Sequence, residues 1–378
     1  MPSRSSSSKP RSVRHAPVGY RDIVAELRDA ILSGKFIAGQ RLPTQVELQK
    51  RFRTTPVTVQ RAIQELAGDG FIRTRGGSGV FVADHPTHLY DYALVFPHDP
   101  ANPPGIWSRY YAALVNEAAA FSQRGDRRVM PFYGMDYVPQ APDYPRLVKR
   151  VESYRLAGII FATAPFRLAD TPVLNQPGIP RVAVMSEPTY PNVPAVWFES
   201  YLPKALDRLA ARGRKRIALL GNFAANAKKL QPLLSARNMR MRPSWAMPLY
   251  PPAVEGARVF VQLLMEGQER PDALIIGDDN LIEPAVAGLI AAGVRTEEEL
   301  DVVAHCFFPW AGPTILPMER IGYDARAVLR TCIELIDRQR RAESVPPVTK
   351  IAAAFEEELS AVRELPAAHE STRIVQPN

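Results

Sequence analysis

Residues 42–66 read LPTQVELQKRFRTTPVTVQRAIQEL and contain two helix starts in close succession. At the first, Thr44 and Glu47 form a capping box, in which a hydroxyl and a carboxylate satisfy amide donors at the start of a helix. We expect this helix to end near Phe52 and to place Val46, Leu48 and Phe52 on its apolar face.

The second helix of this stretch begins at Thr55, the expected N-cap, with Pro56 in the first position, where a missing N–H removes no hydrogen bond. We expect it to end near Gly70, the residue type that terminates helices. Its apolar positions share one face by i, i+3, i+4, i+7 spacing; they are Val59, Ala62, Ile63 and Leu66. The opposite face is polar and partly basic.

The same pattern extends in both directions from this helix pair. Before it, an apolar stripe predicts a helix over residues 20–32, stopped by Gly34. After it, residues 71–75 and 80–83 are separated by Gly76-Gly77-Ser78-Gly79 and predict a hairpin. Three helices followed by a basic-edged hairpin form a winged helix-turn-helix.

This arrangement suits double-stranded DNA, because a helix fits the major groove while a hairpin reaches phosphates or the adjacent minor groove. We expect Gln60 to read bases and Arg73 and Arg75 to position the protein on the backbone. The full set of expected DNA contacts is Thr44, Thr55, Thr58, Gln60, Arg61, Gln64, Arg73, Arg75 and Gly77. The alternative is a protein-interaction module whose basic residues form a solvated face.

Several residues and short motifs of this segment occur at the same spacing in a known protein family. They are Leu42-Pro43-Thr44, Thr58-Val59, Ala62, Leu66, Gly70-Phe71-Ile72 and Gly77-Ser78-Gly79-Val80-Phe81-Val82. Through them, residues 18–83 resemble the N-terminal domain of GntR-family transcriptional regulators. The sequence departs from that family at Thr44-Gln45, where Ser-Glu is usual, and at Pro56 and Gln60, where Arg is common. Because of these departures, the family's usual operator is not carried over to this sequence.

Charge is concentrated in the same part of the chain. Residues 1–90 hold 14 Lys and Arg against 7 Asp and Glu, whereas the whole chain has a net charge of +8. This asymmetry is typical of a nucleic-acid-binding segment joined to a neutral body. Residues 1–17 form a Ser/Arg/Pro-rich tail without the apolar core of a secretory signal, and no stretch is long enough for a membrane span, so we expect a cytoplasmic protein.

Beyond an expected linker over residues 84–91, strands and helices alternate. The apolar runs that predict strands are residues 92–96, 129–133, 158–162, 181–185, 196–198, 217–220, 273–277 and 302–305. The helical stretches are residues 108–123, 145–156, 202–212, 254–267, 282–292 and 325–341. This succession predicts an α/β body of parallel sheets, over residues 92–365, followed by a tail over residues 366–378. Its length favours two subdomains with a ligand cleft between them.

Residues 210–221 and 271–279, with Gly288 and Gly293-Val294, are similar to the ligand-binding domain of LacI-family repressors, which are related to periplasmic sugar-binding proteins. A GntR-type head on such a body resembles the arabinose-repressor type of regulator. The resemblance implies a homodimer and a sugar or other small polar effector. It also implies a first subdomain of residues 92–195 and 304–318, a second of 196–303 and 319–363, and three hinge crossings.

Effector contacts are likewise assigned by this resemblance. Asp279 falls where the family has an acidic residue that accepts hydrogen bonds from ligand hydroxyls, and the alternative is that Asp279 only caps the next helix. The full set of expected effector contacts is Trp107, Ser108, Arg109, Tyr110, Lys229, Tyr250 and Asp279. Trp107 and Tyr110 could instead be core or dimer contacts, and Lys229 a surface charge.

The competing class is an enzyme with an α/β catalytic body and a DNA-binding head. The sequence shows no nucleophile elbow, P-loop, HExxH or dinucleotide fingerprint. Cys306 and Cys332 form no CxxC pair, and His85 and His88 stand in the expected linker. We therefore expect no catalysis, no metal and no cofactor, and we expect a ligand-responsive repressor whose partners are an operator, a small effector and a second copy of the chain.

Overall fold

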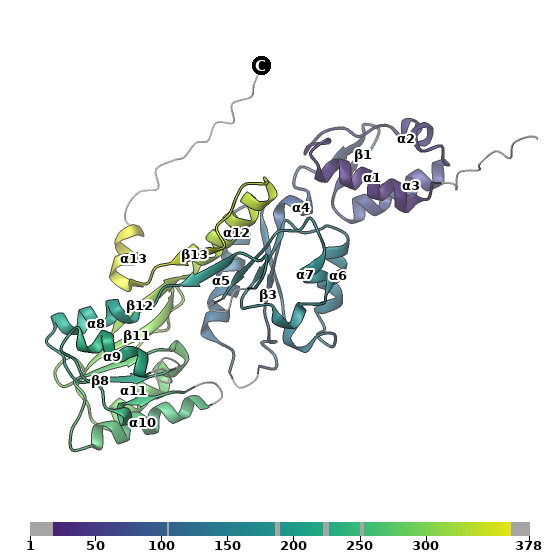
Figure 1. Cartoon of the computed structure of the whole chain (residues 1–378). Coiled ribbons are helices and arrows are strands. Elements are labelled where there is room, and N and C mark those ends of the chain that lie inside the picture. Colours follow the sequence, from purple (N-terminus) through teal and green to yellow (C-terminus); the bar gives the residue numbers. More distant parts are fainter. Residues whose placement is uncertain (1–17, 104–105, 186–189, 222–226, 250–252, 364–378) are drawn as a thin grey trace, which may run out of the picture. The chain divides into compact units, whose positions relative to one another are not determined.

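The computed structural model describes residues 18–103, 106–185, 190–221, 227–249 and 253–363. They form two compact units (Figure 1). The first consists of residues 18–90 together with residues 153–156, and the second of the other described residues from Asp91 onward. The expected tails over residues 1–17 and 366–378 lie outside the described part of the chain, so the domain limits at the two ends stay predictions.

The first unit is a winged helix-turn-helix, as the sequence predicts. Its elements are α1 Tyr20–Leu32, α2 Gln45–Phe52, α3 Pro56–Gly68, β1 Ile72–Arg75, β2 Gly79–Val82 and α4 Thr87–Tyr90. The Thr44 capping box is present, with the Thr44 N–H donating to Glu47 Oε2 at 2.7 Å. Thr55 caps α3 through the Thr58 N–H, and Pro56 opens the helix. β1 and β2 pair antiparallel as the wing.

One apolar core holds the first unit together. It is built by the buried side chains Ile23, Val24, Leu27, Ile31, Leu42, Leu48, Phe52, Val59, Ala62, Leu66, Phe71, Ile72 and Val82. The stripes predicted for α1 and α3 therefore face inward, with Ile63 half-buried at the margin. The prediction for Val46 is wrong: its side chain is 57% exposed. Two positions before Leu48 on a helix is about 200° around the axis, so Val46 lies on the outer face.

The segment over residues 84–91, expected to be an irregular linker, contains a short helix. Residues 87–90 form α4, and Thr87 and His88 are buried. The His88 ring stacks on Phe71 with ring centroids 5.1 Å apart, and the Thr87 hydroxyl donates to the Asp69 carbonyl at 3.0 Å. These contacts attach α4 to the first unit, so residues 87–90 belong to the winged-helix unit and are not part of a linker.

The second unit contains two six-stranded sheets. The first has the order β13-β7-β6-β5-β3-β4, with every pairing parallel. Its subdomain consists of β3 Asp91–Val95, α5 Arg109–Gln123, β4 Arg128–Phe132, α6 Tyr144–Glu152, β5 Gly158–Phe161, α7 Pro172–Asn175, β6 Arg181–Val184, β7 Ala195–Phe198, α12 Ala325–Arg340 and β13 Val348–Ile351. Helices α5 and α12 cover one face, and α6 and α7 the other (Figure 1).

The second sheet has the order β14-β12-β11-β10-β8-β9. Its subdomain consists of α8 Leu202–Ala211, β8 Ile217–Leu220, α9 Ala227–Ser235, β9 Ala246–Met247, α10 Gly256–Glu266, β10 Ala273–Ile276, α11 Ile282–Ala291, β11 Asp301–Phe308, β12 Glu319–Asp324, β14 Ala354–Phe355 and α13 Glu356–Arg363. Helices α10 and α11 pack on one face and α8 and α9 on the other (Figure 1). All pairings are parallel except that of β14 with β12.

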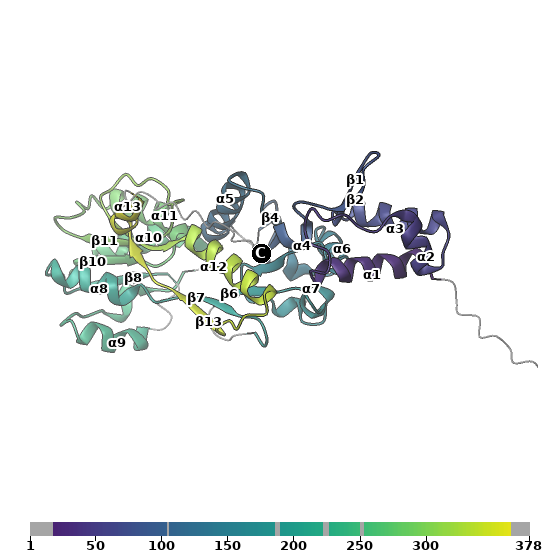
Figure 2. The same ribbon diagram turned by 90° about the horizontal axis from the view of Figure 1, so that it is seen from above.

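The expected division of the chain between the subdomains is wrong in three places. β11 lies entirely in the second sheet, because its eight residues form one continuous buried strand that cannot be split at residue 304. β7 and β13 pair in the first sheet (Figure 2). α12 packs on the first sheet, so closely that a Cβ at Gly158 would lie 2.4 Å from Ile336 Cγ2. The chain nevertheless crosses between the subdomains three times, after β7, β12 and β13.

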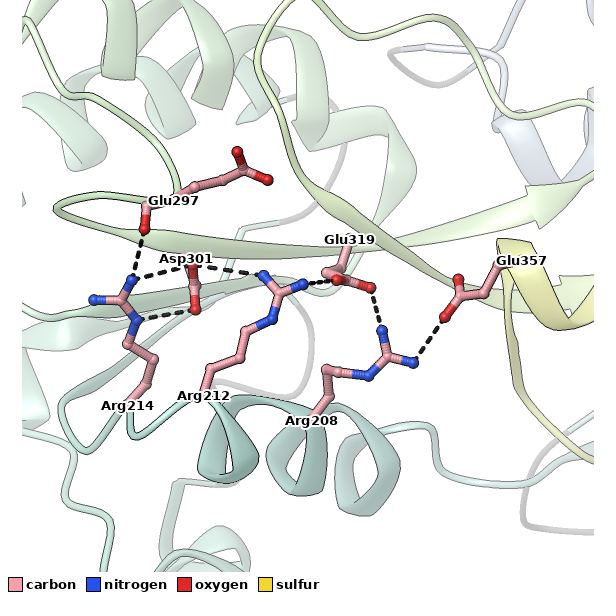
Figure 3. Close-up of polar contacts among 7 residues, drawn as sticks. All are labelled: Arg208, Arg212, Arg214, Glu297, Asp301, Glu319 and Glu357. Atoms are coloured by element: carbon pink, nitrogen blue, oxygen red, sulfur yellow. Dashed lines mark hydrogen bonds and ion pairs between the residues drawn. The ribbon is translucent and has the colours of Figure 1, made fainter.

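A continuous ion-pair network ties α8 to the second sheet (Figure 3). Asp301, at the start of β11 and 3% exposed, accepts two hydrogen bonds from Arg214 at 2.9 and 3.2 Å. Arg208 bridges Glu319 of β12 at 2.6 Å and Glu357 of α13 at 2.7 Å. Arg212 joins the two halves by contacting both Asp301 and Glu319. The network fastens the C-terminal helix α13 and keeps the buried Asp301 carboxylate satisfied.

Candidate functional sites

The outer face of α3 carries the residues expected to read DNA. Gln60, Arg61 and Gln64 are exposed, and Thr58 is half-buried with its hydroxyl 2.8 Å from that of Thr55. The Arg61 guanidinium lies over the Tyr20 ring, 4.0 Å from its centroid. This stacking holds Arg61 near α1. Gln60 and Gln64 form no side-chain hydrogen bond with any residue that the structure describes, so their exposed amides can bond a partner.

The two wing arginines that are expected to contact the DNA phosphates, Arg73 and Arg75, differ in how far they are engaged within the protein. Arg73 is ion-paired with Asp84, so its charge is partly satisfied within the unit. Arg75 is exposed, and its guanidinium lies 5.3 Å from the centroid of the Phe81 ring. Gly77 has φ 71°, a left-handed conformation that glycine adopts without strain. Thr44 has both its N–H and its hydroxyl engaged by Glu47, so its structural role as a cap is established by contacts.

Replacing Gln60 with alanine is expected to change which sequences the protein selects, because a Gln amide can bond adenine bidentately in the major groove. Replacing Arg75 with alanine should weaken binding to all sequences about equally, since a phosphate contact carries no base information. In vitro selection from a random DNA pool, run in parallel on both variants and the wild type, compares the two effects. Unchanged selected sites for Gln60→Ala would exclude Gln60 from base reading.

In the body, each of the two sheets has a topological switch point beside the first strand of its subdomain. β3 lies between β4 and β5, and β8 lies between β9 and β10. The crossovers on the two sides of such a strand run in opposite directions, which opens a crevice at the carboxyl ends of the strands. In the first subdomain a pocket lies there, lined by Phe96, Asp136, Phe161, Thr163 and Arg167. Asp136, Thr163 and Arg167 were missed from the sequence because they have no distinctive spacing, although Thr163 closely follows a predicted strand.

Asp279 follows β10 at the corresponding edge of the second sheet. Its side chain is 7% exposed, and burial together with the adjacent Asp278 raises its pKa to about 7, against the opposing effect of Arg109. The cap of the following helical turn is Asp278, whose carboxylate accepts from the Asn280 N–H at 2.9 Å. The alternative that Asp279 is merely the cap is therefore wrong. A buried carboxyl group with a perturbed pKa at a strand end is typical of a binding site.

The expected contacts at the start of α5 have several internal partners. The Arg109 N–H donates to Asn280 Oδ1 at 3.1 Å, and its guanidinium pairs with Glu283 at 2.5 Å, so this residue links the two subdomains. Ser108 is the N-cap of α5 but its side chain makes no cap hydrogen bond. Asn280, which is 9% exposed and adjacent to Asp279 in the chain, was not among the effector contacts expected from the sequence.

Two aromatic residues near this position belong to ring clusters. Trp107 packs against Phe96 and Tyr111, with centroids 5.8 and 5.3 Å apart. The Tyr110 hydroxyl donates to the Ala162 carbonyl at 3.0 Å, and its ring lies 4.8 Å from that of Phe307 in β11. The Tyr110 ring therefore packs between α5 and β11 and its hydroxyl is already engaged, as a core residue would be. Contact between Tyr110 and an effector stays a prediction.

The remaining effector predictions fall where the structure is not described. Tyr250 lies outside the described residues, and Lys229 belongs to α9 but its side chain lies outside them. Within the described residues, no group of three or more His, Cys, Asp or Glu could hold a metal ion, and none of the helices combines the length and apolar character that a membrane span requires. Cys306 and Cys332 are free and buried.

A winged helix-turn-helix joined to a body of two parallel sheets, each with a topological switch point, defines a DNA-binding protein with a ligand-binding domain. Comparison with known proteins agrees. Residues 19–82 match the family described as "Bacterial regulatory proteins, gntR family". The chain is 23% identical to the arabinose metabolism transcriptional repressor of Halalkalibacterium halodurans, over 86% of this chain and 92% of that protein.

The body resembles solved structures of LacI-family regulators. A regulatory protein of the LacI family from Chloroflexus aggregans has a TM-score of 0.54 and 16% identity, covering 71% of this chain and 96% of that one. A LacI-family regulator from Lactobacillus casei, solved with bound glucose, has a TM-score of 0.51 and 16% identity, covering 70% and 98%. The chain thus joins a GntR-type head to a LacI-type fold; it is a transcriptional regulator, and the enzyme alternative is set aside.

Proposed function

We propose that this regulator is a repressor that binds a pseudo-palindromic operator as a homodimer and responds to a sugar or similar small polar metabolite. Its place of action is then the cytoplasm, where bacterial DNA lies. A single winged helix makes too few base contacts for gene-level specificity, which supports a dimer with two half-sites. The relative that spans most of the chain is an arabinose repressor, and a neighbour in fold was solved with glucose.

The observation that best supports a small polar effector is the buried Asp279 at the switch point of the second sheet. A carboxylate accepts hydrogen bonds from sugar hydroxyls, and Thr163 and Arg167 offer donors at the switch point of the first sheet. Phe96 and Phe161 line the same pocket, but both side chains are almost fully buried, so Thr163 and Arg167 are the groups that an effector would meet there.

Contacts between β7 and β12 support a route by which ligand binding changes the operator affinity. Phe198 of β7 stacks on Tyr323 of β12, with centroids 4.3 Å apart, and the Tyr323 hydroxyl donates to the Glu199 carbonyl. These contacts lie where the chain passes between the subdomains. A ligand that prefers one arrangement of the two subdomains shifts the population toward it, by at most its difference in affinity for the two states.

A thermal-shift screen of monosaccharides and their acids on the full chain tests the effector class. A true effector at 100 times its Kd should stabilise the protein by about 2.7 kcal/mol, which raises Tm by several degrees, whereas glycerol at equal concentration should give no saturable shift. The positive compound should then change the affinity for a selected operator. Saturable binding that leaves operator affinity unchanged would contradict the proposed regulation.

A further inference from the structure

Val57 is an exposed apolar side chain on the face of α3 that also carries Arg61 and Gln64, the residues expected to contact DNA. It lies in the first turn of α3 and is 74% exposed. The helix turns about 100° per residue, so Val57 points directly away from the buried stripe formed by Val59, Ala62 and Leu66. It shares the outermost stripe with Arg61 and Gln64 at i+4 and i+7.

Val46 repeats this feature on the neighbouring helix. It lies in the first turn of α2 and is 57% exposed. The Gln45 side chain donates to the Pro56 carbonyl at 3.1 Å, which ties the beginnings of α2 and α3 together. The entrance of the recognition helix is therefore flanked by apolar groups at Val46, Pro56 and Val57.

Folding gives no reason for a valine at position 57. Its side chain is not part of the core cluster of the first unit. A β-branched residue also loses rotamer freedom in a helix, so alanine at an exposed helical position favours folding more than valine does. The valine is therefore better explained by contact with a partner that the isolated unit lacks.

We propose that Val57 contacts the 5-methyl group of a thymine in the major groove of the operator. The N-terminal residues of a recognition helix are the ones that reach base edges. Among the bases, thymine alone presents an apolar methyl group in that groove, and apolar side chains are its usual contacts. Specificity at this position then comes from burial of two apolar groups in place of hydrogen bonds. The inference rests on the operator binding proposed above.

The test compares thymine with uracil, which lacks only the methyl group. A DNA fragment selected from a random pool by the full-length wild-type protein is prepared in its natural form and with 2′-deoxyuridine replacing thymine at one position at a time. At one position in each half-site the wild type should bind the uracil form about fourfold more weakly, the equivalent of ~0.8 kcal/mol per buried methyl group. Val57→Ala should bind both forms with nearly the same, reduced affinity.

Two controls make the result specific. Leu263→Ala removes another largely exposed apolar side chain, 64% exposed, from α10 of the body and should keep the full thymine preference. Thermal unfolding of Val57→Ala should show no loss of stability, which excludes misfolding as the cause. If Val57→Ala keeps the wild-type ratio between the two DNA forms, Val57 does not contact a thymine methyl and the inference fails. If the wild type selects no sequence at all, operator binding itself is contradicted.

Discussion

Operator affinity is expected to fall by about 10³–10⁵-fold between 50 and 200 mM salt, because each phosphate that a basic side chain neutralises releases a condensed counterion. In the described part of the head, Arg41, Lys50, Arg53 and Arg75 form no ion pair with a carboxylate and remain available. Two heads in a dimer would double this set to about eight contacts, within the range that gives the stated loss. The measurement is operator affinity as a function of salt concentration, plotted on logarithmic axes.

The contribution of a single basic residue to the slope of that plot can be measured by substitution. Arg53→Ala, in the turn between α2 and α3, should reduce the slope by about one for each head that loses its contact. Arg295→Ala is the matched control, because Arg295 is 70% exposed but lies in the body. A slope that stays near zero for the wild type would show that phosphate contacts do not drive binding.

Asp279→Asn is expected to remove a large pH dependence of stability. Burial and the neighbouring Asp278 raise the pKa of Asp279 to about 7, whereas an unfolded aspartate titrates near ~3.9. The folded protein therefore holds this proton more tightly. The resulting stabilisation is complete below about pH 4 and is lost as the pH rises through 7, by up to ~4 kcal/mol at ~1.36 kcal/mol per pKa unit.

Asparagine is neutral at every pH and has nearly the same shape, so at pH 8 the variant should be more stable than the wild type. Urea unfolding of both proteins at pH 4.5, 6 and 8 gives the difference that isolates this residue. Glu298→Gln is the control, since Glu298 is 64% exposed and should follow the wild type at each pH. Parallel stability curves for Asp279→Asn and the wild type would mean that Asp279 ionises as freely as in the unfolded chain. Such a cost to folding agrees with the effector contact proposed for Asp279, because a buried carboxylate is kept where function requires it.

The sequence alone determined the winged helix-turn-helix, because its signals are local. The capping box at Thr44 and Glu47, the Thr55-Pro56 helix start and the glycine turn of the wing each act within a few residues, and the structure has all of them. The alternation of strands and helices in the body was likewise visible. It follows from apolar runs that parallel sheets bury on both faces.

Only the tertiary structure decided which segment joins which sheet and which polar groups meet. β11, β13 and α12 were misassigned or missed because strand pairing joins residues far apart in the sequence, such as Val348 with Ala195. The ion-pair network of Asp301, and the contact of Arg109 with Asn280, likewise join distant residues. The structure also shows which stripe of each helix is buried. With Leu48 of α2 and Val59 of α3 in the core, the helical period then places Val46 and Val57 on the outer faces.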